Sequence, residues 1–148
     1  MRAGLILWMY GVVAGHLIIG MLLPWLAGWP LLEGYHRYLE FQFWGQNVPS
    51  GVRSVQVWWI SLLGATISCM SLWMGALVYF GARYRNPVAW SWLIFGILLW
   101  APQDMWISLQ HNAWLHVYFD IAALLAMLPP LLCLWWIDRQ QARMVGAA

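Results

Sequence analysis

The sequence carries very little charge. Of its 148 residues, 8% are charged and 64% are hydrophobic, lysine is absent, and all seven positive side chains are arginine. Soluble domains contain about 25% charged residues, so the composition excludes an ordinary water-soluble protein. It also argues against nucleic-acid binding, because no soluble basic surface exists to neutralise phosphates. The chain is predicted to be an integral membrane protein in contact with the lipid bilayer.

Cysteine is almost absent as well. Cys69 and Cys133 lie in separate apolar segments, and no CxxC motif occurs. Thiol–disulfide exchange needs exposed, paired thiols of low pKa. The two cysteines are therefore predicted to be buried small hydrophobic residues without a redox role.

Long apolar runs make up most of the chain. Runs of about 20 residues can cross a hydrocarbon core of roughly 30 Å as helices, and these runs do not alternate as the strands of a membrane barrel do. The predicted fold is an all-α integral membrane protein, a four-transmembrane-helix bundle forming one domain over residues 1–148. Its spans are expected at about 5–26, 55–80, 88–109 and 113–137.

Prolines fall inside two of the predicted spans. The third span is purely apolar only up to Pro102, and we expect it to continue to about residue 109 with a kink and a buried Asp104. Neighbouring groups in a membrane protein can satisfy the carbonyl that a proline leaves free. The fourth span is expected to be broken at Pro129-Pro130.

The connection between the first two spans predicts an amphipathic helix in the membrane interface, over about residues 30–44. Pro30 suits the first turn of a helix. The polar residues recur at three- and four-residue spacing and share one face; they are Glu33, His36, Arg37 and Glu40. An interfacial helix has this pattern, with its other side in lipid or against protein.

Small residues predict where the spans approach one another. Gly11 and Gly15 form a GxxxG pattern in the first span, and Gly20 extends its small residues. The second span has small residues at Gly64, Ser68 and Gly75. Such patterns allow close packing of membrane helices, so we expect another helix to approach the first span closely.

The arginines predict the orientation. Five of them fall at one end of the predicted bundle and two, Arg37 and Arg53, at the other. Because positive residues are enriched on the cytoplasmic side, both termini are expected in the cytoplasm, in a multi-pass protein of a bacterial inner membrane. The helix at 30–44 and the 103–113 turn then face outward.

The stretch from Asp104 to Asp120 is the most polar part of the predicted spans. Asp104 and His111 share a helix face, as do His116 and Asp120 at i, i+4 spacing,. Charged groups facing lipid are strongly disfavoured, so both faces should point into the bundle. The predicted site is an outward-opening polar pocket. It is lined by His16, Asp104, His111, His116 and Asp120, beneath the ligand-binding candidates Glu33, His36 and Glu40.

Several functions fit such a pocket. It can hold a lipophilic ligand or substrate, with His116 and Asp120 as an acid/base pair. It can bind a cation, since His116 and Asp120 are also candidate ligands of a divalent metal, and Glu33-x-x-His36 has the spacing used twice in bundle di-iron sites. It can serve haem or quinone electron transfer, with His16 and His116 as axial ligands.

A structural role fits the same residues. Paired buried polar groups also hold helices together. The protein is then a non-catalytic accessory or assembly subunit of a larger membrane complex, or a homo-oligomer. The sequence leaves these alternatives open.

One short fragment has a family resemblance. The fragment AWLHVYFD, with His16 and His36, resembles small four-span haem-associated membrane oxidases of the protoporphyrinogen-oxidising type. The lysine expected after the WLH triplet is missing and the fragment lies in a different span. No residue role is therefore carried over from that family.

Overall fold

The computed structural model describes residues 1–146, and their regular structure is entirely helical. The elements are α1 (Arg2–Leu26), a 3-10 turn η1 (Pro30–Leu32), α2 (Glu33–Trp44), α3 (Val52–Tyr84), α4 (Pro87–Gln110) and α5 (Trp114–Gly146). Four of them, α1, α3, α4 and α5, are long and apolar enough to cross a membrane. The all-α fold with four candidate spans is confirmed, and these helices indicate a multi-pass membrane protein.

Glycine, asparagine and proline mark the ends of the helices. Asn86 caps α4, because its Oδ1 accepts a hydrogen bond of 2.9 Å from the backbone N–H of Val88, and Pro87 takes the first helical position,. Gly45 and Gly51 lie at the ends of the segment between α2 and α3. Their φ angles are 59° and 91°, which glycine adopts without steric cost,.

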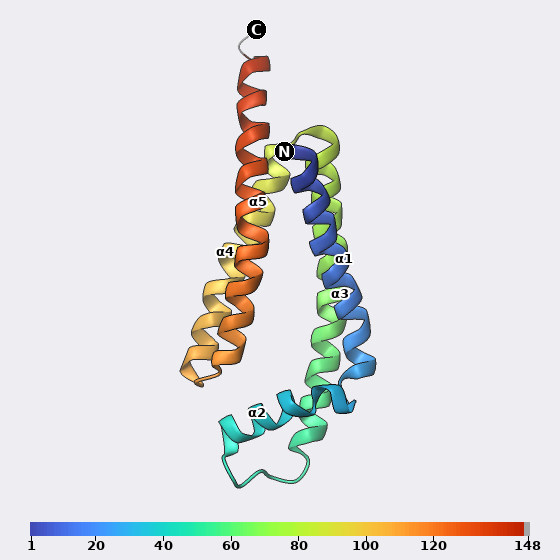
Figure 1. Ribbon diagram of the computed structural model, residues 1–148, viewed down its shortest axis with the longest axis vertical. Helices are drawn as coiled ribbons and strands as arrows, with labels where there is room; N and C mark the ends of the chain where they lie inside the picture. Colours follow the sequence, from blue (N-terminus) through green and yellow to red (C-terminus); the bar gives the residue numbers. More distant parts are fainter. Residues whose placement is uncertain (147–148) are drawn as a thin grey trace.

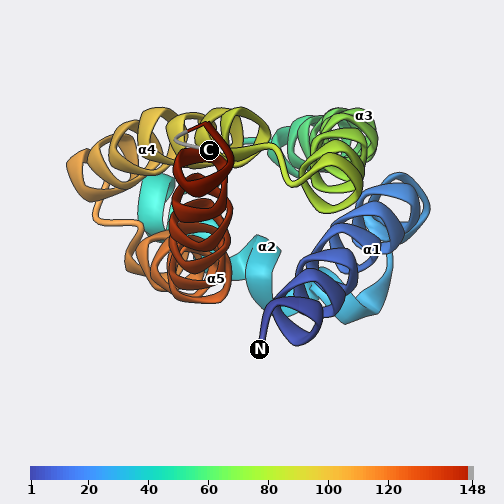
Figure 2. The same cartoon turned by 90° about the horizontal axis from the view of Figure 1, so that it is seen from above.

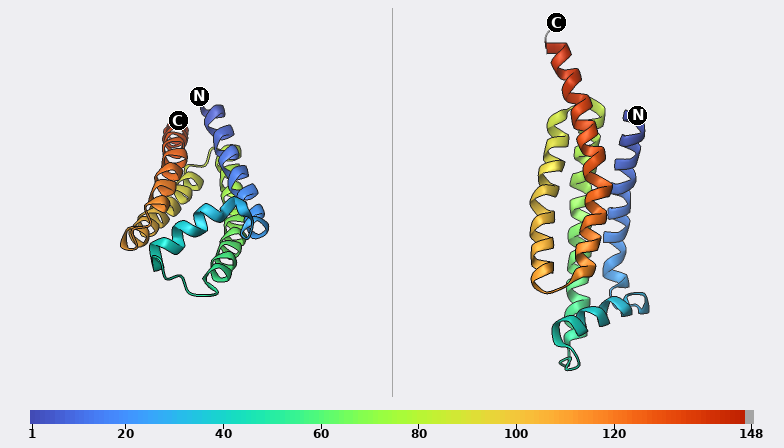
Figure 3. Two further views of the ribbon diagram at one scale, coloured as in Figure 1. Left: turned by 60° about the horizontal axis from the view of Figure 1, so that its bottom comes forward. Right: turned by 60° about the vertical axis from the view of Figure 1, so that its left-hand side comes forward.

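The four long helices form two pairs. α1 packs along α3, and α4 packs along α5 (Figure 1). The pairs meet near the chain termini and diverge toward the other end, where α2 lies across the opening (Figure 3). Seen along the long axis, α2 runs between the two pairs (Figure 2). We call these the terminal end and the α2 end.

The apolar core lies where the two pairs meet. All four spans contribute to it, and its buried residues are Met9, Val78, Trp90, Leu93, Ile97, Met127, Leu131 and Leu134. The α2 end has no comparable cluster among the described residues, because the helix pairs diverge there. Any pocket between the pairs is therefore expected near α2.

A polar network ties all four spans together at the terminal end. Arg2 Nε donates to Oδ1 of Asp138 at 2.8 Å, and the same guanidinium donates to the carbonyls of Gly81 and Ala82. Trp90 Nε1 donates to the other Asp138 oxygen at 2.9 Å. A Cβ at position 81 would lie 2.6 Å from the Trp90 ring, so only glycine fits there. We call this network the Asp138 clasp.

The close approach of α1 and α3 occurs at Gly20 and Gly64. A Cβ on Gly20 would lie 2.6 Å from the backbone nitrogen of Ser68, and one on Gly64 would lie 2.9 Å from the carbonyl oxygen of Gly20. Gly11 and Gly15 face open space. The prediction that another helix approaches the first span closely is therefore confirmed, and the contact lies at Gly20 instead of at the GxxxG pair.

α5 passes through both of its prolines without interruption. The predicted break at Pro129-Pro130 is wrong. Pro130 has no N–H to donate to the carbonyl of Ala126, and Trp8 Nε1 of α1 donates to that carbonyl instead, at 2.7 Å. A neighbouring helix thus satisfies the freed group, which allows the helix to continue. α4 likewise continues past Pro102 to Gln110, as predicted. Asp104 is only partly buried, however, so the prediction that it is buried is wrong.

Both cysteines lie on the outside of the bundle. Cys69 and Cys133 are free and exposed, so the prediction that they are buried is wrong. A thiol behaves as a small apolar group. Lipid provides an apolar surrounding, so these side chains do not need to be inside the protein.

Candidate functional site

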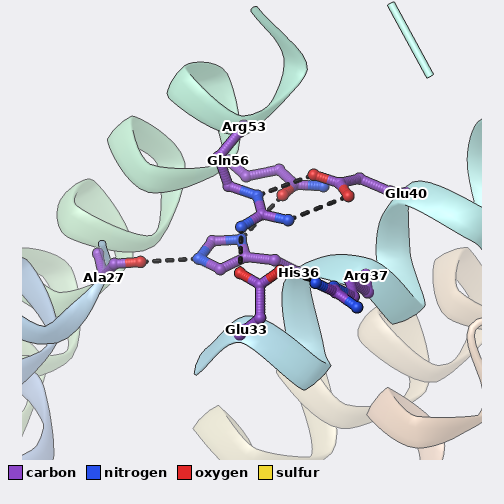
Figure 4. Close-up of polar contacts among 7 residues, drawn as sticks. All are labelled: Ala27, Glu33, His36, Arg37, Glu40, Arg53 and Gln56. Carbon is purple, nitrogen blue, oxygen red and sulfur yellow. Dashed lines mark hydrogen bonds and ion pairs between the residues drawn. The ribbon is translucent and has the colours of Figure 1, made fainter. Parts of the chain in front are cut away.

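One side of α2 is fixed to the α1–α3 pair through a buried histidine. His36 is almost fully buried, with Nε2 2.7 Å from the carbonyl oxygen of Ala27 and Nδ1 2.8 Å from the side-chain amide of Gln56 (Figure 4). Since a carbonyl only accepts, Nε2 carries a hydrogen. Both ring nitrogens are occupied, so His36 holds the helix in place instead of presenting a free ligand atom.

The two α2 glutamates are bound by arginines. Arg53 of α3 forms two hydrogen bonds with Glu40, of 2.8 and 3.0 Å, and also pairs with Glu33. Arg37 donates to Glu33 at 2.6 Å. The Arg53 hydrogen bond, followed by that of Arg37, lowers the pKa of Glu33 to about 2, and Arg53 also lowers the pKa of Glu40. Figure 4 shows both glutamates turned toward arginine.

The other side of α2 contacts the α4–α5 pair. The hydroxyl of Tyr35 and Nε2 of His116 form a hydrogen bond of 2.8 Å, and their rings stack with centroids 5.7 Å apart. The Tyr38 hydroxyl accepts a hydrogen bond from the backbone N–H of Leu115 at the start of α5. α2 therefore bridges the two helix pairs at the end where they diverge.

Two carboxylates lie on α4 and α5 near this contact. Asp120 is 5% exposed, and its Oδ2 has no hydrogen-bond partner among the described residues. Asp104 accepts a hydrogen bond of 3.0 Å from Trp100 Nε1. It lies six residues before the end of α4, and Asp120 lies six residues after the start of α5, so both are at the same level of the α4–α5 hairpin. Burial raises the pKa of the Tyr35 phenol to about 12, and the charge of Asp104 adds to this effect,.

The remaining two histidines are placed differently. His111 is exposed in the α4–α5 turn, where its ring lies 5.1 Å from that of Phe43 on α2. His16 lies on α1, and its Nδ1 is 2.8 Å from the carbonyl of Val12 in the same helix. The structure thus brings Asp104, His116 and Asp120 together with Tyr35, and leaves His16 outside this group. We call these four residues the Tyr35 cluster.

A cavity of about 710 Å³ lies beneath α2, against α3. Its walls are mostly apolar; they are formed by Tyr35, Leu39, Phe43, Trp44, Ser50, Gly51, Val52, Val55, Gln56, Trp59, Ile60, Leu62, Leu63 and Thr66. Several wall residues on α3 are exposed, among them Trp59 and Leu63, so the cavity is not closed. We call this space the α2 cavity.

The α2 cavity and the Tyr35 cluster share one residue. Tyr35 lines the cavity and bonds to His116, whereas none of the five residues predicted to line the pocket borders the cavity itself. Sequence reasoning missed Tyr35, although Tyr35, Leu39 and Phe43 recur at four-residue spacing and so mark one face of α2. It also missed that Arg53 would bind both glutamates.

Residues 1–146 contain no group of three or more His, Cys, Asp or Glu side chains that could hold a metal ion. Comparison with known protein families, curated proteins and solved structures found no match. The function is therefore inferred from the geometry alone.

Proposed function

We propose that this protein binds a lipophilic molecule from the membrane in the α2 cavity, with a polar group of that molecule directed toward the Tyr35 cluster. The observation that carries this proposal is that one side chain, Tyr35, belongs to both. Its ring is part of an apolar wall, and its hydroxyl bonds to His116 of α5. Sites for small molecules commonly combine an apolar lining with a few polar groups that fix orientation.

The size and position of the cavity favour a lipid-like occupant. A volume of 710 Å³ lies within the range of about 300–1,000 Å³ that is usual for ligand pockets,. Because Val55, Trp59 and Leu63 line the cavity and are exposed, the cavity is open to its surroundings, so a molecule can enter it from the bilayer. An apolar chain loses nothing by leaving lipid for such a cavity.

Two residues of the Tyr35 cluster are suited to acid–base chemistry if the molecule is a substrate. His116 is partly buried and its Nε2 faces the Tyr35 hydroxyl, while Asp120 is buried one helical turn further along α5. No hydrogen bond joins His116 to Asp120 among the described residues. Asp120 Oδ2 has no partner there, whereas His116 Nε2 would exchange its bond to Tyr35 for one to the bound molecule. In this proposal they remain the candidate acid/base pair.

The geometry supports a haem or metal site less well. His16 and His116 lie on different helix pairs, and each has a nitrogen occupied by a hydrogen bond. His36 has both nitrogens occupied, and Glu33 and Glu40 are paired with arginine. Neither His16 with His116 nor His36 with Glu33 and Glu40 belongs to a group of three or more side chains that could hold a metal ion among the described residues.

One observation favours a second role as an accessory subunit or oligomer. Gly11 and Gly15 leave open space on α1 that no helix of this chain fills, and small residues at this spacing allow another membrane helix to pack closely. A partner helix on this face is compatible with a ligand in the α2 cavity.

The orientation is part of the proposal. Arg83 and Arg85 lie where α3 ends, next to Arg2 and the last turns of α5, whereas Arg37 and Arg53 lie at the α2 end. The excess of arginine supports a cytoplasmic terminal end. The α2 cavity then opens in the outer leaflet of a bacterial inner membrane.

A matched pair of tryptophan substitutions tests the proposed function. Leu63→Trp should fill the cavity, whereas Leu99→Trp changes a leucine of similar exposure, 56% against 50%, that does not line it. Binding of a radiolabelled single-chain lipid to the purified protein should fall at least tenfold in Leu63→Trp and stay unchanged in Leu99→Trp. Equal binding by both variants and the wild type would contradict the proposal.

A further inference from the structure

The α2 end carries more carboxylate side chains than arginines. Four carboxylates are found there, those of Glu33, Glu40, Asp104 and Asp120, against two arginines. Arg37 and Arg53 are both bound to the α2 glutamates. No arginine of the described residues is left for the two aspartates, and the nearby His116 bonds through Nε2 to Tyr35 and forms no hydrogen bond with Asp120.

Asp120 lies in an environment that makes this imbalance costly, because it is 95% buried and its Oδ2 has no partner among the described residues. Asp104, which is partly buried, lies six residues before the end of α4 and Asp120 six residues after the start of α5, so the two carboxylates lie at the same level of the α4–α5 hairpin. A buried charge is strongly unfavourable unless it is paired. The arrangement therefore calls for a positive group between Asp104 and Asp120.

That group reaches the aspartates from one side only. Between Asp120 and Asp138, α5 contributes the buried residues Met127, Leu131 and Leu134 to the apolar core. This core separates the aspartates from the terminal end. Toward the α2 end, His116 lies one helical turn from Asp120 and bonds to Tyr35, and Tyr35 borders the α2 cavity.

A metal ion does not fit these residues, because the described part of the chain has no group of three or more side chains that could hold one. A primary ammonium group fits better. It carries three N–H donors and one positive charge, and carboxylates are its strongest acceptors.

We propose that the ligand of the α2 cavity is a lipophilic amine, whose ammonium group lies between Asp104 and Asp120 while its apolar chain occupies the cavity. This inference rests on the proposed function and names its ligand class. Tyr35 and His116 then lie beside the ammonium group, at the point where the polar and apolar parts of the ligand meet. The arrangement selects amines over neutral or acidic lipids of the same chain.

The test compares three probes with the same eighteen-carbon chain: oleylamine, oleyl alcohol and oleic acid. Their binding is measured at pH 7 to the protein in phosphatidylcholine nanodiscs, with empty nanodiscs subtracted. A charge-assisted hydrogen bond contributes about 1.5–3 kcal/mol, so oleylamine should bind at least about tenfold more tightly than oleyl alcohol. Oleic acid should bind most weakly.

Substitutions then assign the preference to the two aspartates. Asp104→Asn and Asp120→Asn keep the shape of the side chain and remove its charge, so each should bring the amine-to-alcohol ratio close to one. Asp120→Glu restores the charge and should retain part of the preference. Thermal unfolding of each variant shows whether it is folded.

The outcomes separate this inference from the proposed function. Equal binding of oleylamine and oleyl alcohol by the wild type is expected if the aspartates only share a proton. That result overturns the amine proposal and leaves the proposed binding of a lipophilic molecule in the α2 cavity in place. A preference that persists in both Asn variants overturns it too. If none of the three probes binds, or Leu63→Trp weakens none of them, the proposed function itself fails.

Discussion

Asp138 of α5 lies at the centre of the hydrogen-bond network that joins all four spans. It has no exposed surface, and it accepts hydrogen bonds from Arg2 of α1 and Trp90 of α4, while Arg2 also binds two α3 carbonyls. Sequence reasoning used Arg2 only to predict orientation and gave Asp138 no role. A single aspartate near the end of the sequence forms no repeating pattern, so nothing in the sequence pairs Asp138 with Arg2.

The clasp gives a prediction at the residue scale. Asp138→Ala should lower the free energy of unfolding by about 3–5 kcal/mol, because it removes the only carboxylate that pairs with the partly buried Arg2 among the described residues,. Replacing both partners, as in Arg2→Met with Asp138→Leu, should restore most of that loss. Unfolding in mixed micelles, followed by tryptophan fluorescence, measures both. If the single and double variants are equally unstable, the clasp acts by another route.

Glu33 gives a second prediction at this scale. Its pKa in the folded protein is about 2, below the usual value of 4.5, because Arg53 and Arg37 bind its charged form. A depressed pKa stabilises the attachment of α2 above about pH 4.5, and this contribution is lost as the pH falls through about 2. Neutral and mildly acidic solutions should therefore leave α2 in place.

The titration of Glu33 can be followed directly by carbon NMR of its carboxyl group. The midpoint should lie near pH 2 in the wild type and move toward 4.5 in Arg53→Gln. Arg83→Gln, at the opposite end, is the matched control and should leave the midpoint unchanged. A wild-type midpoint at the ordinary value would mean that the ion pairs do not form in solution.

At the scale of elements, the crossing of α1 and α3 depends on glycines that only the structure distinguishes. A Cβ on Gly64 would meet Gly20 and Pro24 within 3 Å, whereas one on Gly11 or Gly15 would meet nothing within 4 Å. All of them look alike in sequence, since a small-residue pattern shows that close packing is possible and not where a partner lies. The sequence therefore predicted a close helix approach but not which glycines form the contact.

Alanine substitutions at these glycines should therefore differ. Gly64→Ala forces α1 and α3 apart and should cost about 1–3 kcal/mol of unfolding free energy, as overpacking usually does. Gly15→Ala meets open space and should be neutral or slightly stabilising, by up to about 1 kcal/mol, because alanine favours the helix. Melting temperatures in detergent compare the two. A larger loss at position 15 would contradict the packing of α1 against α3 at Gly20 and Gly64.

At the scale of the whole molecule, the sequence allows prediction of the helices but not of their arrangement. Apolar run lengths located the spans, and the polar spacing of residues 33–40 located the α2 helix. The divergence of the two helix pairs and the placement of α2 across the opening depend on contacts between distant residues, such as Tyr35 with His116. No periodicity within one helix encodes such contacts.

The candidate site was predictable to a similar extent. Helical spacing puts His116 and Asp120 on one face of α5, and the cost of charge in lipid indicates that this face points inward. The apolar cavity beside them is formed by α2 and α3, and Tyr35 joins the two regions. The functional roles of these residues stay predictions.

The central claim is that a lipophilic molecule occupies the α2 cavity, and mapping a photoreactive ligand tests it most directly. The protein in membranes is irradiated with a single-chain lipid amine that carries a diazirine near the middle of its chain, and the labelled peptides are sequenced. We expect labelling to concentrate on cavity residues such as Trp59 and Leu63, and to disappear with excess unlabelled ligand. Labelling spread evenly over exposed residues of all four spans, and unaffected by competitor, would contradict the account.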